Sequence, residues 1–327
     1  MSATLRGFYD DNYATAPSNP LPGTAPAQSS YGFEVSPSFG LNLSQESSAL
    51  AFKYTYGMRY YENRINSADH SHQADASVSH EFTPRAKFSA TDSFVVAQEA
   101  ALLDPGVAAT ALRSNGNNVH NTVSVLLENK LTRLLGTEVG YSNSFFDYEQ
   151  TGPGSRSALL DRVEHLAHAH LLWYAVPTTT VIFGYQFGVV NQTSKDFLTA
   201  TELPDTRDNR SHYGYLGADH YLTEQLSFHP RVGVQYTTYP NAPAGVDGNR
   251  VSPYADFKVS WAYAQNCDAQ VGVKHSRTQT DVAGAAGSPT LDAETTAIYG
   301  AVNHHFTAKI SGSLLGQYQR SEFNQGP

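Results

Sequence analysis

Bulky apolar residues occupy every second position over long stretches of this chain. Between positions 31 and 43 the pattern consists of Tyr31, Phe33, Val35, Pro37, Phe39, Leu41 and Leu43, with small, polar or acidic residues between them. The stretch from 50 to 60 repeats it with Leu50, Phe52, Tyr54, Tyr56, Met58 and Tyr60. Because a β-strand turns successive side chains to opposite faces, each stretch predicts a strand with one apolar and one polar face.

The connections between about fifteen candidate strands alternate between short and long. The short ones are 44–48, 82–87, 131–135, 175–180, 222–226, 264–268 and 306–309. The long ones include 14–30, 98–118, 150–159, 191–209, 240–250 and 278–294, and they contain strand-breaking Pro, Gly, Asn and Asp. Short turns at one end and long loops at the other are typical of transmembrane β-barrels.

These patterns predict an all-β fold, a transmembrane antiparallel up-and-down β-barrel with about fifteen visible strands. No apolar run approaches the roughly 18 residues that a membrane helix needs, and no linker interrupts the repeat, so residues 1–327 are predicted to form one outer-membrane β-barrel domain. Since bacterial single-chain barrels have an even strand count, we expect a C-terminally truncated barrel of about 16–18 strands when complete. The first residues do not form a secretory signal peptide, which we expect to be absent from this chain.

Composition narrows the function classes. The single cysteine, Cys267, excludes an internal disulfide framework and a cysteine-rich metal site. The net charge of −9 argues against a nucleic-acid partner, since no basic stripe is available to neutralise phosphates. The 20 Tyr and 16 Phe, against 2 Met and 2 Trp, favour strands over helices.

Charged residues recur on the polar faces of the predicted strands, where we expect them to line a pore. The predicted pore-lining residues are Arg6, Glu34, Lys53, Arg59, Asp75, Glu81, Lys87, Glu138, Arg162, Glu164, Arg231, Asp256, Lys258 and Lys274. Their signs are mixed, so they form no ring that selects one ion charge. Two interpretations are open: opposite charges pair across strands and stiffen the wall, or they set up a transverse field across a water-filled pore.

The thirteen histidines raise the question of a metal site. On a strand His168 and His170 share a face, whereas His165 points to the other, so these three residues do not form a compact site without a bulge. His70 and His72 share a face beside Asp69 and Asp75, which suggests a weak zinc or copper patch. The alternative, which we favour, is that all are polar wall or rim residues, with no metal site, catalytic site or cofactor.

Aromatic residues cluster near the predicted strand ends. The clusters are Phe8, Tyr9 and Tyr13; Tyr60 and Tyr61; Phe145, Phe146 and Tyr148; and Tyr236 and Tyr239. Amphipathic rings suit the headgroup level of a membrane, so they are expected to form an outer girdle; the alternative is ordinary sheet packing.

Several strand segments resemble the β-barrel porins of Gram-negative bacteria, in particular the verrucomicrobial-type outer membrane β-barrel proteins. The resemblance rests on residues 5–13, 31–38, 92–99 and 140–148. It implies a bacterial outer-membrane location and a porin-like transport function. It also implies that complete members carry further strands and an aromatic C-terminal end, which this chain does not show.

The predicted function is an outer-membrane channel for passive diffusion of small polar solutes. Its expected partners are outer-membrane lipid, the solutes themselves and, in a homo-oligomer, further copies of the chain. Loop 98–118 is expected to fold inward as a constriction or to form a short helix. No Gly-x-Ser-x-Gly or His-Glu-x-x-His phrase occurs, so nothing recommends an enzyme barrel.

Three other classes stay open. A barrel that exports an exopolysaccharide predicts aromatic and acidic residues along its lumen. A non-conducting surface or scaffold barrel predicts a plugged lumen. A soluble all-β adhesin predicts a second sheet over the apolar stripe, with short connections at both ends.

Overall fold

The computed structural model describes residues 1–13, 28–99, 115–280, 282–285, 288–307 and 310–324. Its long strands are β1 (Ser2–Asp10), β2 (Ser30–Ser44), β3 (Ser48–Tyr61), β4 (Ala68–Thr83), β5 (Ala86–Glu99), β6 (Asn115–Lys130), β7 (Leu135–Tyr148), β8 (Arg162–Val176), β9 (Thr179–Gln192), β10 (Asn209–Tyr221), β11 (Leu226–Thr238), β12 (Asn249–Ala264), β13 (Cys267–Thr278), β16 (Asp292–Thr307) and β17 (Ile310–Asn324). The short elements are helix α1 (Arg156–Leu160), the 3-10 helix η1 (Pro204–Arg207), β14 (Gly284–Ala285) and β15 (Ser288–Pro289).

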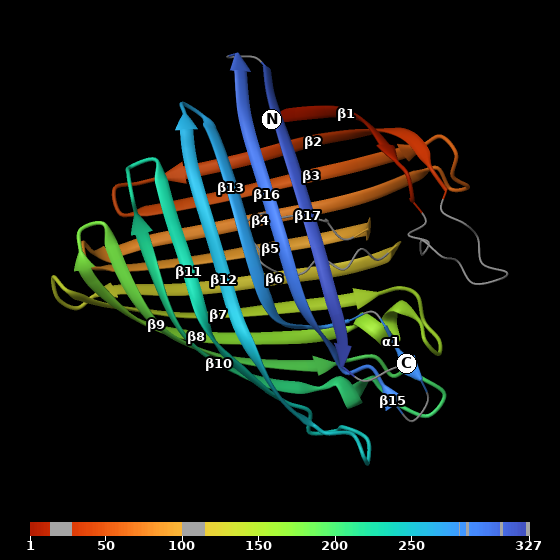
Figure 1. Ribbon diagram of the computed structural model, residues 1–327. Coiled ribbons are helices and arrows are strands. Elements are labelled where there is room, and N and C mark those ends of the chain that lie inside the picture. Colours follow the sequence, from red (N-terminus) through yellow and green to blue (C-terminus); the bar gives the residue numbers. More distant parts are fainter. Residues whose placement is uncertain (14–27, 100–114, 281, 286–287, 308–309, 325–327) are drawn as a thin grey trace.

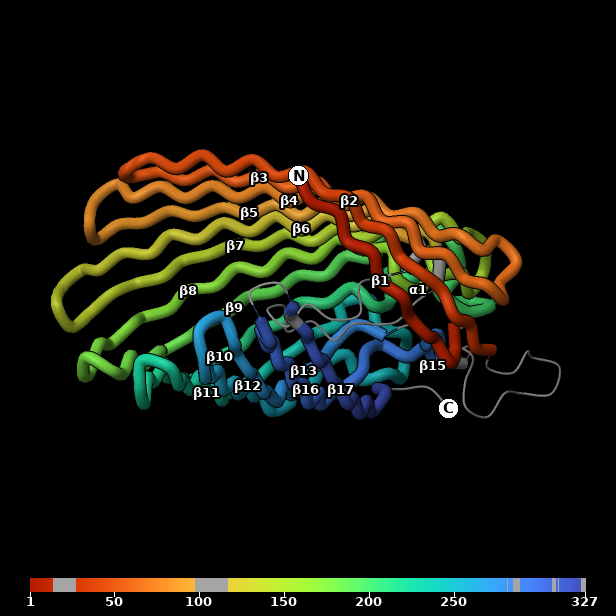
Figure 2. Tube along the Cα trace, turned by 90° about the horizontal axis from the view of Figure 1, so that it is seen from above, coloured from red at the N-terminus to blue at the C-terminus, as the bar shows by residue number. Residues whose placement is uncertain are grey.

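The fifteen long strands form one antiparallel sheet in which each strand pairs with the next along the chain. This confirms the predicted all-β, up-and-down arrangement. The sheet curls, so that β11 to β17 face the earlier strands across its concave side (Figure 1, Figure 2). Within the described residues, no pairing joins β1 to β17. Neither helix of the described chain is long and apolar enough to cross a membrane.

A threonine closes four of the short turns in a similar way. The side-chain oxygens of Thr83, Thr132 and Thr223 each accept hydrogen bonds from the backbone N–H groups two and three residues later. Thr307 Oγ1 accepts one from the N–H of Ile310 at 3.0 Å. These bonds satisfy backbone donors that the turn leaves without a strand partner, so the local sequence ends one strand and starts the next.

The two faces of the sheet differ as the alternation predicts. Phe33, Leu41, Val139, Phe183 and Val271 lie on the outer face and are exposed. Positions that alternate with these residues are less exposed and mainly polar or glycine. No second sheet covers the outer face in the described part of the chain, contrary to the adhesin alternative.

Candidate pore-lining face

Strand register places all fourteen predicted pore-lining residues on the same, concave face of the sheet. Residues opposite each other in neighbouring strands share a face. Arg6, Glu34, Arg59 and Asp69 form one such row across β1 to β4. The Arg6 Nη2–Glu34 Oε2 distance is 2.6 Å, and Arg59 Nη2 lies 3.2 Å from the same oxygen. Cross-strand pairing of opposite charges is therefore present at this edge.

A second row starts at Lys53 and crosses β3 to β8. Lys53 stands opposite Asp75, whose Oδ1 accepts a 2.7 Å hydrogen bond from Ser93 Oγ. The row continues through hydroxyl residues to Glu164, which Arg162 Nε contacts at 2.6 Å from the same strand.

A third row crosses β4 to β8 nearer the short turns. Its facing positions are Glu81, Lys87, Glu128, Glu138 and His170. Acidic residues predominate in this row, and Lys87 lies between two of them.

The remaining predicted residues lie on β11 to β13. Arg231 stands opposite Asp256, and Asp256 stands opposite Lys274, so the charge alternates from strand to strand. Lys258 shares the face and stands opposite His229. The sequence analysis did not single out Asp219, which lies 2.7 Å from Arg231 Nη2 and 2.8 Å from His229 Nδ1. The sequence could have identified Asp219 as an inward-facing residue, because it lies four residues after Tyr215 in an alternating strand and so shares its face.

Large side chains of this face lie across glycines of neighbouring strands. Tyr215 on β10 is flanked by Gly184 on β9 and Gly233 on β11, and a Cβ at either glycine would lie within 2.6 Å of a Tyr215 side-chain atom. Tyr299 lies over Gly272 in the same manner, and a Cβ added at Gly272 would lie 2.3 Å from the ring Cζ. The missing side chains let the rings lie flat against the wall instead of projecting into the concave space.

Three long connections, 149–161, 193–208 and the described part of 279–291, fold together at one end of the sheet, which we call the mouth. Tyr148, Leu159, Leu160 and Leu198 form a buried apolar cluster, and Ala283 packs against it. Ala283 belongs to the connection after β13, and four strands separate β13 from β8 in the sheet. The described part of the connection 279–291 therefore reaches across the mouth.

Arg207 ties three of these connections together. Its side chain is 1% exposed. Nε donates to the carbonyl of Thr290 at 2.8 Å, Nη1 donates to those of Thr280 and Leu159, and Nη2 donates to that of Val282. Four carbonyl acceptors around one guanidinium hold the mouth by charge-assisted hydrogen bonds.

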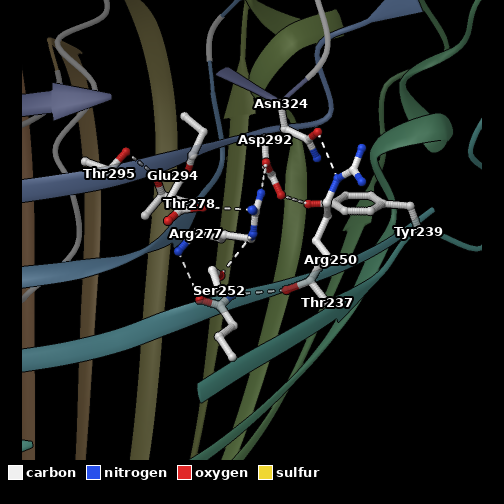
Figure 3. Close-up of polar contacts among 12 residues, drawn as sticks. Thr237, Tyr239, Arg250, Ser252, Arg277, Thr278, Asp292, Glu294, Thr295 and Asn324 are labelled. Atoms are coloured by element: carbon white, nitrogen blue, oxygen red, sulfur yellow. Dashed lines mark hydrogen bonds and ion pairs between the residues drawn. The ribbon is translucent and has the colours of Figure 1, made fainter. Parts of the chain in front are cut away.

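A polar network extends the mouth over the ends of β11 to β17 (Figure 3). Arg277 contacts Asp292 at 2.9 Å and Glu294 at 2.8 Å, and Asp292 is 1% exposed. The hydroxyl of Tyr239 donates to Asp292, and Arg250 Nε donates to Asn324 Oδ1 at 3.0 Å. Sequence alone did not identify this network, because its members come from different strands and Tyr239 reaches Asp292 across β12 and β13.

The carboxyl group of Asp161, between α1 and β8, lies within the mouth. It accepts hydrogen bonds from the N–H of Tyr148 at 2.8 Å and from the hydroxyl of Ser157 at 2.5 Å. Burial raises its pKa to about 6, and the two hydrogen bonds only partly oppose this effect. The carboxyl group therefore titrates near pH 6, well above the usual range of an aspartate.

Three sequence expectations need correction or lie outside the described residues. His70 and His72 lie on the outer face, where Nδ1 of each contacts a tyrosine hydroxyl, at Tyr56 and Tyr54 respectively. Asp69 and Asp75 point to the concave face because alternate residues of β4 face opposite ways, so the proposed zinc or copper patch is wrong. Residues 100–114 of the predicted inward loop lie outside the described residues.

Only part of the predicted outer girdle lies on the exposed face of the sheet. Tyr9, Tyr60, Phe145 and Tyr236 are exposed on the sheet, as expected. In contrast, the last tyrosine of each cluster is buried; these residues are Tyr13, Tyr61, Tyr148 and Tyr239. Adjacent strand residues face opposite ways, so pairs such as 60 and 61 divide between the two faces.

No protein-family model matches the sequence, and no curated protein matches it. Similar solved structures include a mutant of the ferric enterobactin receptor PfeA from Pseudomonas aeruginosa, at 10% identity and a TM-score of 0.46. The siderophore receptor PiuA from Acinetobacter baumannii gives 10% and 0.42, and the ferric-catecholate import receptor Fiu from E. coli gives 9% and 0.40. The matches cover 98%, 99% and 96% of this chain but 53%, 60% and 57% of those structures. The chain thus spans somewhat more than half of their length.

Proposed function

We propose that the chain forms the wall of an outer-membrane β-barrel whose polar concave face lets small polar solutes cross by diffusion. The observation that supports this proposal is the difference between the two faces of the sheet: the outer face has an exposed apolar band, and the concave face has rows of charged residues. A sheet with lipid on one side and water on the other accounts for this separation, since no second sheet covers the apolar face in the described part of the chain.

Three tyrosines lie at one level of the outer apolar band. Tyr54, Tyr141 and Tyr185 are each the seventh residue of their strands, counted from the short-turn end. Each hydroxyl lies 2.7 Å from the Nδ1 atom of a histidine on the next strand. The histidines are His72, His165 and His212. Each of these tyrosine hydroxyls therefore has a polar partner within the otherwise apolar outer face.

The lower edge lies near the short turns. Trp173 and Trp261, the two tryptophans of the chain, are 45% and 49% exposed near the short-turn ends of β8 and β12. Phe82 and Phe306 are exposed at the same end. Seven residues span roughly 20 Å along a strand, which a tilt of about 40° reduces to roughly 15 Å across the membrane. An apolar band of about 25 Å therefore extends beyond the tyrosines, to exposed residues such as Phe145.

The concave face favours a diffusion channel over a saccharide exporter. A sugar stacks on an exposed ring face, but Tyr215 and Tyr254 are each only 8% exposed on this face. The charged rows remain the more accessible chemistry: the side chains of Arg6, Arg59 and Glu34 are 57%, 34% and 24% exposed. Mixed charges give such a pore weak selectivity.

Single-channel recording in a planar bilayer tests this proposal with the full chain refolded in detergent. We expect stable ohmic steps. Lys258→Glu on the concave face should shift the reversal potential in a salt gradient towards cation preference. Arg210→Glu, an equal charge change on the outer face of β10, is the matched control and should leave the reversal potential unchanged.

Two outcomes contradict the proposal. A membrane-inserted, β-rich protein without conductance steps would indicate a plugged scaffold barrel. Equal shifts from both variants would show that the concave face does not line the conducting path.

A further inference from the structure

Three potential metal ligands meet in the wall where β7 and β8 pair. His170 Nδ1 lies 2.7 Å from Glu138 Oε1, and His168 Nε2 lies 3.4 Å from the same oxygen. The ligand atoms of the three side chains all lie within 4.8 Å of one another. The two imidazole rings stack, with 4.8 Å between their centroids.

The local sequence places these side chains together. His168 and His170 are alternate residues of β8 and so share the concave face, and Glu138 stands directly opposite His170. His168 stands opposite Gly140, where a Cβ would lie 2.2 Å from the histidine Cε1 and 2.5 Å from its Nε2. The absent side chain at Gly140 leaves the space through which the His168 ring approaches Glu138.

We propose that Glu138, His168 and His170 bind a divalent transition-metal ion, Zn²⁺ in the first instance. Imidazole nitrogens and a carboxylate oxygen suit this class of metal, and three protein ligands leave a fourth position open to water or a solute. Ligand atoms about 2.05 Å from a tetrahedral zinc ion are roughly 3.3 Å apart. The His168–Glu138 distance already fits, and the His170–Glu138 distance must widen by roughly 0.6 Å.

Tyr215 orients the His170 ring for this role. Its hydroxyl oxygen lies 2.5 Å from His170 Nε2 and accepts a hydrogen bond from Gln186 Nε2 at 3.0 Å. When Nδ1 gives its lone pair to the metal, Nε2 carries the proton and donates it in a hydrogen bond to the tyrosine oxygen. Outer partners of this kind fix the tautomer and ring orientation of metal-binding histidines.

Calorimetric titration of the detergent-refolded full chain with ZnCl₂ tests the proposal, and Co²⁺ absorption reports the coordination geometry. We expect one ion per chain and a tetrahedral Co²⁺ spectrum. His168→Gln and Glu138→Gln should each weaken binding on the order of 100-fold or more, and Tyr215→Phe by roughly 10-fold.

Two further variants separate ligand loss from misfolding. His165→Gln changes a histidine on the outer face of the same strand and should bind as the unmodified chain does. Gly140→Ala keeps all three ligands but displaces the His168 ring, and it should weaken binding. Undetectable Zn²⁺ binding by the unmodified chain, or unchanged affinity in His168→Gln, would overturn the proposal.

Discussion

Glycines on the concave face leave space for large side chains of neighbouring strands. The ring of Tyr299 lies over Gly272 and the ring of Tyr215 lies over Gly184, each in space that a Cβ at the glycine would occupy. The sequence of one strand does not show which large side chain each glycine accommodates. That pairing depends on register between strands, which the sequence of one strand does not contain.

Replacing Gly272 by alanine tests this arrangement. The new Cβ would lie 2.3 Å from Tyr299 Cζ, so the ring must rotate away from the wall. We expect a loss of about 1–3 kcal/mol in the free energy of unfolding and a lower conductance. Denaturant unfolding and single-channel recording measure the two effects.

Gly214→Ala is the control, because Gly214 lies on the outer face of β10 and a Cβ added there would meet no atom within 4 Å. A similar loss in both variants would show that the cost comes from glycine's backbone and not from contact with the ring.

The histidines also show that the sequence of one strand predicts the face of a residue but not its neighbours on other strands. Alternation correctly separated His165 from His168 and His170. It did not bring Glu138 to these two histidines, because Glu138 comes from another strand. For His70 and His72 the nearby aspartates were considered by chain distance, although their parity already assigned them to the opposite face.

At the scale of the elements, the strands and the short turns could be predicted from the sequence. Alternation predicted the strands, and the sorting of connection lengths predicted their up-and-down order. The mouth could not be predicted from the sequence, since α1, η1 and the described part of the connection 279–291 depend on contacts with distant segments. Ser155 does cap α1 by accepting a hydrogen bond from the N–H of Ala158, but the helix has only five residues.

Acidity should strengthen the mouth through Asp161. Burial raises its pKa from 3.8 to about 6, so the folded protein binds the proton more tightly than the unfolded chain. The cost of a buried carboxylate is fully present above pH 6 and disappears as the pH falls from about 6 towards 4. We expect the long connections to resist proteolysis better at pH 5 than at pH 7, measured with a protease active at both values.

Asp161→Asn should remove most of this pH dependence, since the amide resembles the protonated carboxyl group and does not titrate. Asp208, whose pKa burial also raises, remains and contributes with the same sign. Greater protease resistance at pH 7 than at pH 5 in the unmodified chain would contradict the assignment.

The edge of the apolar band near the short turns predicts how deeply the whole molecule lies in a membrane. Trp173 and Trp261 stand near its short-turn edge. In vesicles, lipids brominated near the headgroup should therefore quench tryptophan fluorescence more strongly than lipids brominated near the chain ends. Trp173→Phe and Trp261→Phe allow each residue to be measured alone.

Stronger quenching by the deep bromines would place the short turns inside the membrane and contradict this depth. Absence of quenching by either lipid would contradict membrane insertion. The porin resemblance stays a prediction at this scale, since the whole-molecule fold is confirmed only as an all-β antiparallel sheet.

The connection that crosses the mouth also orders the folding of the chain. The hydrogen bond from Arg207 to Thr290 joins residues 83 positions apart, and the strands between them must first curl to bring the two ends together. Contacts between neighbouring strands are local and form with a small loss of loop entropy, whereas this contact closes a long loop. The mouth is therefore expected to form last, and a protease-resistant mouth marks a chain that has completed its folding.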